Sequence, residues 1–109
     1  MVLRALPLAA LIAGVIFALP QVAAAADGNA DRGLEKSREV CALCHIVEDG
    51  GQGNAGLPTF PGIAKDPETD AARLRAWLAV PHPQMPQFDS LTAQDVEDII
   101  AYIESLKGE

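Results

Sequence analysis

Two thiols and an imidazole stand within five residues of one another, in the run Cys41-Ala42-Leu43-Cys44-His45. Cysteines three apart on a helical turn point to the same side, so both sulfurs can reach one group. The spacing C-x-x-C-H is that of c-type haem attachment, in which the sulfurs form thioethers and the histidine binds the iron. We therefore predict one haem c, attached covalently through Cys41 and Cys44, with His45 as an iron ligand.

Two other chemistries use the same residue types. A C-x-x-C pair can be a redox dithiol, and cysteine together with histidine can bind zinc. A zinc site needs a fourth ligand, and the only other histidine of the chain is His82. A thioredoxin-like dithiol requires a βαβ context, which the helical pattern of this chain does not offer. Haem attachment is therefore the favoured interpretation.

A second iron ligand is expected from the segment P-H-P-Q-M-P at positions 81–86. Three prolines in six residues fix backbone angles, which lowers the entropy lost when the segment is ordered. Met85 is the only methionine after residue 26, and we predict that it binds the iron opposite His45. His82 is the alternative ligand, and a methionine that merely fills a gap in the core is the alternative for Met85.

The first 26 residues have the plan of a secretory signal peptide. Arg4 provides a positive start, residues 5–20 are an uninterrupted apolar run, and four alanines at 23–26 offer cleavage sites. An uncleaved membrane anchor is the alternative, since about 20 apolar residues can span a bilayer. We expect a signal peptide over 1–26, a single domain over 27–109 and a periplasmic location, or else a membrane-anchored protein facing the periplasm.

Residues 27–109 are acidic and poor in aromatic side chains. They carry seven Lys and Arg against fifteen Asp and Glu, a net charge of −8, because Arg4 is the only charged residue before them. Such a domain repels nucleic acid, so we expect redox protein partners with a basic or neutral docking face. We expect contact with a membrane only if the N-terminal segment is retained. A chain of this size with few aromatics is marginally stable alone, which a large apolar cofactor would correct.

The apolar spacing predicts helices and no strands after residue 26. A first helix is expected over 27–40 with Asn29 as its N-cap, followed by a glycine-rich loop over 47–58. A second helix is expected to begin at Asp66 or Thr69 and to end before residue 81. For the last helix, Thr92 and Asp95 resemble a capping box. Apolar residues on one face of that helix follow at positions 96, 99, 100, 103 and 106.

Taken in order, these features resemble the small bacterial class I cytochromes c. Besides C-A-L-C-H, they are Gly33 eight residues before Cys41, P-T-F at 58–60, the 81–86 segment and A-Y-I-E-S-L at 101–106. The resemblance implies a compact all-α class I fold, with three or more helices wrapped around one covalently bound haem. It also implies that the first and last helices cross where Gly33 meets Tyr102.

The same resemblance assigns further residues to the site. It implies that the Pro58 carbonyl accepts a hydrogen bond from the other ring nitrogen of His45, and that Phe60 walls the haem together with Ile63, Leu74 and Leu78. Trp77, Arg73 and Arg75 are candidates to meet the haem propionates, with packing or a solvent-facing position as the alternatives. The chain departs from many members at Lys36 and Ser37, where they carry a bulky apolar pair.

The expected function is single-electron transfer between redox partners, without enzymatic activity. An iron with both axial positions filled offers no site for a substrate. One alternative is a membrane-tethered haem subunit of a larger oxidoreductase. Another is a ligand-binding haem protein in which Met85 is displaceable.

Overall fold

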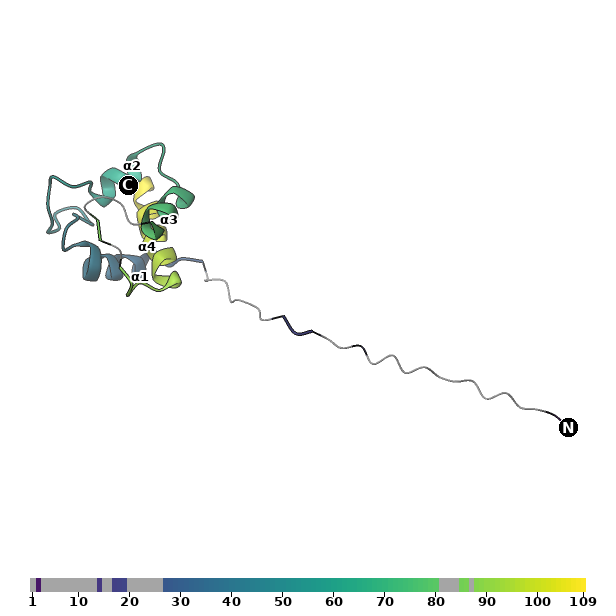
Figure 1. Cartoon of the computed structure of the whole chain (residues 1–109). Helices are drawn as coiled ribbons and strands as arrows, with labels where there is room; N and C mark the ends of the chain where they lie inside the picture. The colour runs from purple at the N-terminus through teal and green to yellow at the C-terminus, as the bar shows by residue number, and fades with distance from the viewer. Residues whose placement is uncertain (1, 3–13, 15–16, 20–26, 81–84, 87) are drawn as a thin grey trace.

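The computed structural model describes residues 2, 14, 17–19, 27–80, 85–86 and 88–109, and its helices are shown in Figure 1. They are α1 (Ala30–Lys36), the π-helical turn η1 (Ser37–Cys41), α2 (Phe60–Lys65), α3 (Ala71–Ala79), α4 (Ala93–Ser105) and the 3-10 turn η2 (Leu106–Gly108). No strand occurs among the described residues, which contain one isolated bridge position at Met85. The predicted all-α class is confirmed.

Helix α1 has an N-cap at Asn29. The Asn29 side chain accepts a hydrogen bond of 2.9 Å from the Arg32 amide, and Asp31 stands in the first turn, where its charge suits the helix dipole. The cap is as predicted, but the start at residue 27 was wrong by three residues. The helix continues into η1, where the Ala42 amide donates to the Ser37 carbonyl at 2.9 Å, one residue further back than in an α-helix.

Helices α1 and α4 pack against each other, and their labels lie close together in Figure 1; Gly33 stands at their closest approach. A Cβ on Gly33 would collide with the Asp98 carbonyl and would lie 2.8 Å from the Tyr102 Cβ, so only glycine allows this approach. The expected contact of Gly33 with Tyr102 is therefore present. It holds α1, which continues into η1 and Cys41, against helix α4.

The loop over 47–58 contains no helix, as predicted, but the helix α2 that follows it was missed. Thr59 caps α2 by accepting a hydrogen bond of 3.0 Å from the Gly62 amide. The expected starts of the next helix were wrong, because Asp70 caps α3 through a 2.7 Å bond from the Arg73 amide. Asp66 instead accepts from the Glu68 amide at 2.9 Å, which forms a turn before the helix.

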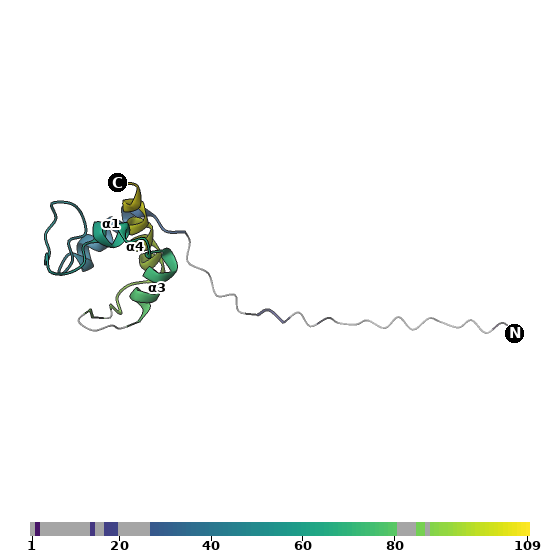
Figure 2. The same ribbon diagram turned by 90° about the horizontal axis from the view of Figure 1, so that it is seen from above.

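Helix α4 has both halves of the predicted capping box. The Thr92 hydroxyl accepts from the Asp95 amide at 3.0 Å, and the Asp95 carboxylate accepts from the Thr92 amide at 2.9 Å. Helix α4 packs against α1, α2 and α3, and Figure 2 shows it between α1 and α3. The buried apolar core consists of Cys41, Val47, Phe60, Ala64, Leu74, Ile99, Ile100, Tyr102, Ile103 and Leu106.

Across the described part of the chain, none of the helices combines the length and the apolar character needed to cross a membrane. The predicted signal peptide at 1–26 and the ligand candidate His82 lie outside the described residues, apart from positions 2, 14 and 17–19 of the former.

Candidate haem site

The C-x-x-C-H run forms a tight turn at the end of η1. The amides of Cys44 and His45 both donate to the Cys41 carbonyl, at 3.1 and 2.8 Å. Cys41 is buried in the core, whereas Cys44 is exposed, and neither forms a disulfide. Leu43 between them is 80 % exposed. One thiol is thus embedded beside the core while the other lies at the surface.

Burial raises the pKa of the Cys41 thiol to about 11, although contact with Ser37 opposes the shift. A reactive redox cysteine has its pKa lowered instead, because the thiolate is the nucleophile. The environment of Cys41 therefore does not favour the redox dithiol alternative. Nor do three or more His, Cys, Asp or Glu side chains of the described residues gather into a group that could hold a metal ion.

The His45 ring is held through one nitrogen. Its Nδ1 lies 2.7 Å from the Pro58 carbonyl oxygen, which is the contact that the resemblance implied. A carbonyl can only accept, so Nδ1 carries the proton and the lone pair of the neutral ring is on Nε2. That is the tautomer which an iron ligand requires, and a hydrogen bond at the other nitrogen raises its donor strength. The residues present therefore fit a haem iron bound at His45 Nε2.

Phe60 links this ring to the core. Its ring centroid lies 5.8 Å from that of His45 and 6.4 Å from that of Tyr102. Phe60 and Leu74 are buried, and Ile63 and Leu78 are half-buried against the same core. The four residues predicted to wall the haem thus contribute to one apolar cluster.

Met85 is half-buried, and it lies beyond α3 in the chain. Its role as an iron ligand remains a prediction. The runner-up ligand, His82, cannot be compared with it, since it lies outside the described residues.

The three residues of α3 that could contact the haem propionates lie at the protein surface. Arg73 pairs with Glu68 at 3.0 Å, and Arg75 pairs with Glu97 at 2.7 Å, on the protein surface. Trp77 is half exposed. The two arginines thus face solvent in ion pairs, and their contact with the haem propionates stays a prediction.

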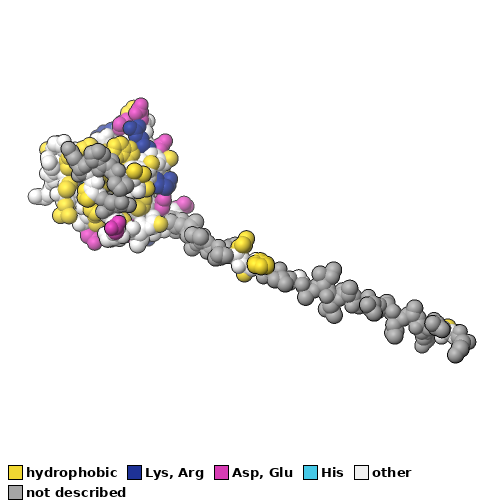
Figure 3. Space-filling model, in the orientation of Figure 1, with side chains coloured by type: hydrophobic (Ala, Val, Ile, Leu, Met, Phe, Trp, Pro, Cys, Tyr) yellow, Lys and Arg dark blue, Asp and Glu magenta, His cyan; other side chains and the backbone are white. Residues whose placement is uncertain are grey.

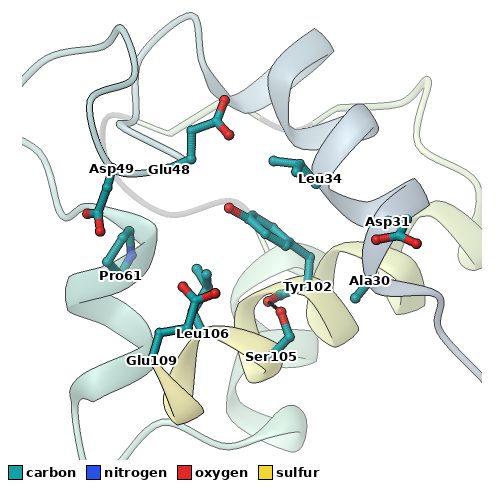
Figure 4. A pocket seen from close by; sticks show the side chains of 10 residues that line it. All are labelled: Ala30, Asp31, Leu34, Glu48, Asp49, Pro61, Tyr102, Ser105, Leu106 and Glu109. Carbon is teal, nitrogen blue, oxygen red and sulfur yellow. Dashed lines mark hydrogen bonds between the residues drawn. The ribbon is translucent and has the colours of Figure 1, made fainter.

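A hollow elsewhere on the surface is separate from this site. Figure 4 shows the carboxylates of Asp31, Glu48 and Asp49 around it, with Tyr102 between them. None of Cys41, Cys44, His45, Pro58, Phe60 or Met85 lines it. The hollow is therefore not where the haem chemistry is expected.

Several backbone contacts that hold the C-x-x-C-H turn could not be read from the sequence. The Asn54 amide donates to the Cys44 carbonyl at 2.9 Å, and the Phe60 amide donates to the Ile46 carbonyl at 2.9 Å. Gly53 lies directly against the His45 backbone. The glycine-rich composition of the loop indicated close wrapping, but it did not indicate which glycine makes the contact.

Comparison with known proteins agrees with this site. Residues 28–103 match the family model described as cytochrome C oxidase, cbb3-type, subunit III. The chain is also 38 % identical over 80 residues to Cytochrome c-552 of Bradyrhizobium diazoefficiens, covering 72 % of this chain and 76 % of that protein. No solved structure matches. This chain belongs to the cytochrome c family and is a c-type cytochrome that carries covalently bound haem c for electron transfer.

Proposed function

We propose that this protein is a single-haem electron carrier of the periplasm. Cys41 and Cys44 hold the haem, and His45 and Met85 bind its iron. The observation that carries the proposal is the 2.7 Å contact between His45 Nδ1 and the Pro58 carbonyl, which leaves Nε2 for the metal. When bound, the haem supplies a one-electron couple between ferric and ferrous iron.

The residues around the haem would orient the His45 ring and keep a substrate from reaching the iron. Pro58 fixes the orientation of the His45 ring, and Phe60 packs against that ring from the core side. With His45 and Met85 both bound to it, the iron would offer no open site for a substrate. The protein therefore works as an electron carrier and not as an enzyme.

The charge of the domain favours partners with a basic or neutral face. Six ion pairs occupy basic side chains of the described domain, formed by Arg32, Lys36, Arg38, Arg73, Arg75 and Lys107. Because acidic residues outnumber basic ones by eight over 27–109, carboxylates without such a partner set the sign of the surface field. A positively charged partner would be attracted, and added salt would screen that attraction over about 8 Å at physiological ionic strength.

Apolar side chains offer a second component of docking. Leu43, Trp77 and Val80 are 80, 50 and 62 % exposed. Leu43 lies within the haem attachment turn. In Figure 3, hydrophobic side chains cover much of the visible face of the domain, with charged groups toward its edge. A flat dependence of the electron-transfer rate on salt would assign docking to apolar contact, whereas a steep decrease would assign it to charge.

A second candidate function differs only in location and assembly. The matching family model is described as a subunit of an oxidase, which favours a haem subunit of a larger, membrane-bound oxidoreductase. The two candidates differ in the fate of residues 1–26. Mass spectrometry of the protein from a periplasmic fraction should give a chain beginning near Asp27. Recovery of the full chain from membranes would favour the subunit.

The test of the haem site itself is an absorption spectrum of the purified protein in both oxidation states. We expect the sharp reduced bands of a low-spin haem c and a near-infrared band from methionine bound to ferric iron. The haem should stay with the polypeptide after acid extraction, because thioethers hold it. Haem that extracts freely would contradict attachment at Cys41 and Cys44.

A further inference from the structure

Gly53 has a backbone conformation that side chains with a Cβ rarely adopt, with φ of +148°. A Cβ at this position would lie 2.6 Å from the carbonyl carbon and from the carbonyl oxygen of His45, and 2.7 Å from the Ile46 nitrogen. All three are main-chain atoms, so they cannot rotate away as the end of a flexible side chain can. The loop therefore touches the peptide group that follows the proximal histidine.

The next residue strengthens this contact. The Asn54 amide donates a hydrogen bond of 2.9 Å to the carbonyl oxygen of Cys44, the residue before His45. The Asn54 side chain in turn accepts from the Gly56 amide at 2.8 Å, which fixes the local turn. Gly53 and Asn54 thus hold the main chain on both sides of His45.

The same loop also reaches the His45 ring. Five residues after Gly53, the Pro58 carbonyl lies 2.7 Å from Nδ1 of the imidazole. One short segment therefore fixes both the backbone and the ring of His45. Any change that pushes position 53 away from the His45 peptide must also move the carbonyl that orients the ring.

We propose that Gly53 is a positioning residue for the proximal iron ligand, which rests on the proposed role of His45. By lacking a side chain, Gly53 lets the loop lie against the His45–Ile46 peptide and keeps the Pro58 carbonyl in line with Nδ1. It thereby sets how strongly the imidazole donates to the iron, and so the midpoint potential.

The chain contains a matched control. Gly50 lies in the same loop and also has a positive φ, of +73°, but a Cβ there would meet no atom within 4 Å. An alanine at Gly50 therefore suffers an unfavourable backbone conformation without a collision. Comparing alanine at the two positions separates conformational strain from contact with His45.

The experiment compares ferric and ferrous holoprotein of wild type, Gly53→Ala and Gly50→Ala. Wild-type nuclear magnetic resonance should show the His45 ring protons strongly shifted by ferric iron, which tests His45 as ligand independently of Gly53. Gly53→Ala should displace these resonances and raise the midpoint potential, because a weakened Nδ1 hydrogen bond lowers the donor strength that stabilises ferric iron. Gly50→Ala should lower the unfolding midpoint while leaving the resonances and the potential at wild-type values.

Asn54→Gly serves as a second variant because it adds no atom and can be studied even if Gly53→Ala yields no holoprotein. It removes the side-chain bond to Gly56, loosens the segment and should move the His45 resonances in the same direction by a smaller amount. The inference is overturned if Gly53→Ala keeps the wild-type resonances and potential. It is equally overturned if Gly53→Ala cannot be obtained and Asn54→Gly leaves the His45 resonances unmoved.

Discussion

The Tyr102 hydroxyl donates a buried hydrogen bond of 2.6 Å to the Val47 carbonyl oxygen and so joins helix α4 to the chain just after the haem attachment turn. Tyr102 also packs against Phe60, which contacts His45. Burial raises the pKa of the Tyr102 phenol, so the hydroxyl remains a donor throughout the neutral range. Contacts 55 residues apart in sequence thus support the proximal side of the site.

Removing this hydroxyl should weaken the fold more than the site. In Tyr102→Phe the Val47 carbonyl loses its partner in a buried position, which costs about 1–3 kcal/mol. Denaturant unfolding of the holoprotein should show this loss with an unchanged m-value, and the haem absorption bands should be retained. An unaltered free energy of unfolding would mean that water or another donor replaces the hydroxyl.

Asp98 should make stability depend on acid pH. Its nearly buried carboxylate accepts hydrogen bonds from Arg32 Nε at 2.9 Å, the Asn29 amide at 2.8 Å and Gln94 Nε2 at 3.0 Å. The Arg32 hydrogen bond, aided by the others and opposed by burial, lowers the pKa of Asp98 from 3.8 to about 2. Because the pKa of Asp98 is lower in the folded protein than in the unfolded one, its carboxylate stabilises the fold at pH values above the unfolded pKa. This stabilisation is lost as the pH falls from about 4 to about 2.

The corresponding variant is Asp98→Asn, which keeps the shape but removes the charge. At neutral pH it should be less stable than wild type by about 2 kcal/mol, since each pKa unit corresponds to about 1.4 kcal/mol. The difference should shrink as acid protonates Asp98 in the wild type. Unfolding curves measured from pH 7 to pH 2 test this, and a difference that stays constant over that range would exclude Asp98 as the titrating group.

The parts of the fold that were predictable from sequence are those set by residues three or four apart. The Asn29 cap and the Thr92–Asp95 capping box are both of this kind. Helix α2 was missed because its six residues, which include Pro61 and Gly62, are too few to show a helical period. The start of α3 was misplaced because Asp66, Thr69 and Asp70 are all possible caps, and local propensity does not choose among them.

The site divides in the same way. The C-x-x-C-H spacing identifies Cys41, Cys44 and His45 from sequence, because one turn of chain determines their arrangement. The close approach of Gly53 to His45 depends on the path of a whole loop, and four glycines between residues 50 and 56 look alike in sequence. Only the folded path of the loop determines that Gly53, and not Gly50, contacts His45.

The buried hydroxyl of Ser37 should be dispensable. Ser37 is fully buried, and in the part of the chain that the structure describes its Oγ meets no hydrogen-bonding group except the Cys41 sulfur, which is a weak acceptor. Since burying a hydroxyl with so weak a partner is unfavourable, Ser37→Ala should leave the holoprotein as stable or stabilise it by up to about 1 kcal/mol. Thermal unfolding measures the change.

Ser105→Ala is the control for that variant. Ser105 lies in helix α4, and its hydroxyl donates to the Tyr102 carbonyl at 2.5 Å. Both variants gain the helix propensity of alanine, but only Ser105→Ala loses a hydrogen bond. Ser37→Ala should therefore be the more favourable of the two. The reverse order would mean that the Ser37 hydroxyl has a favourable interaction at Cys41.

The haem should be required for folding. The buried residues of α1 and η1 are Gly33, Ser37 and Cys41, which offer little apolar side-chain area, so a covalent haem would supply much of what the domain lacks. The doubly substituted protein Cys41→Ala, Cys44→Ala should lack native helix content by circular dichroism in the absence of haem. A cooperative thermal transition with native helix content in that protein would refute the requirement.

Met85 should bind the iron in both oxidation states. It is the only methionine between residues 27 and 109, and it is half-buried next to Pro86. Because axial methionine raises the reduction potential of a histidine-ligated haem, Met85→Ala should lower the midpoint potential and abolish the near-infrared band of the ferric protein. It should also allow added imidazole or cyanide to bind at much lower concentration.

His82→Ala is the matched control and should leave the band, the potential and the affinity for added ligands at wild-type values. If His82→Ala removes the native spectrum while Met85→Ala preserves it, the axial assignment is reversed and His82 is the second ligand.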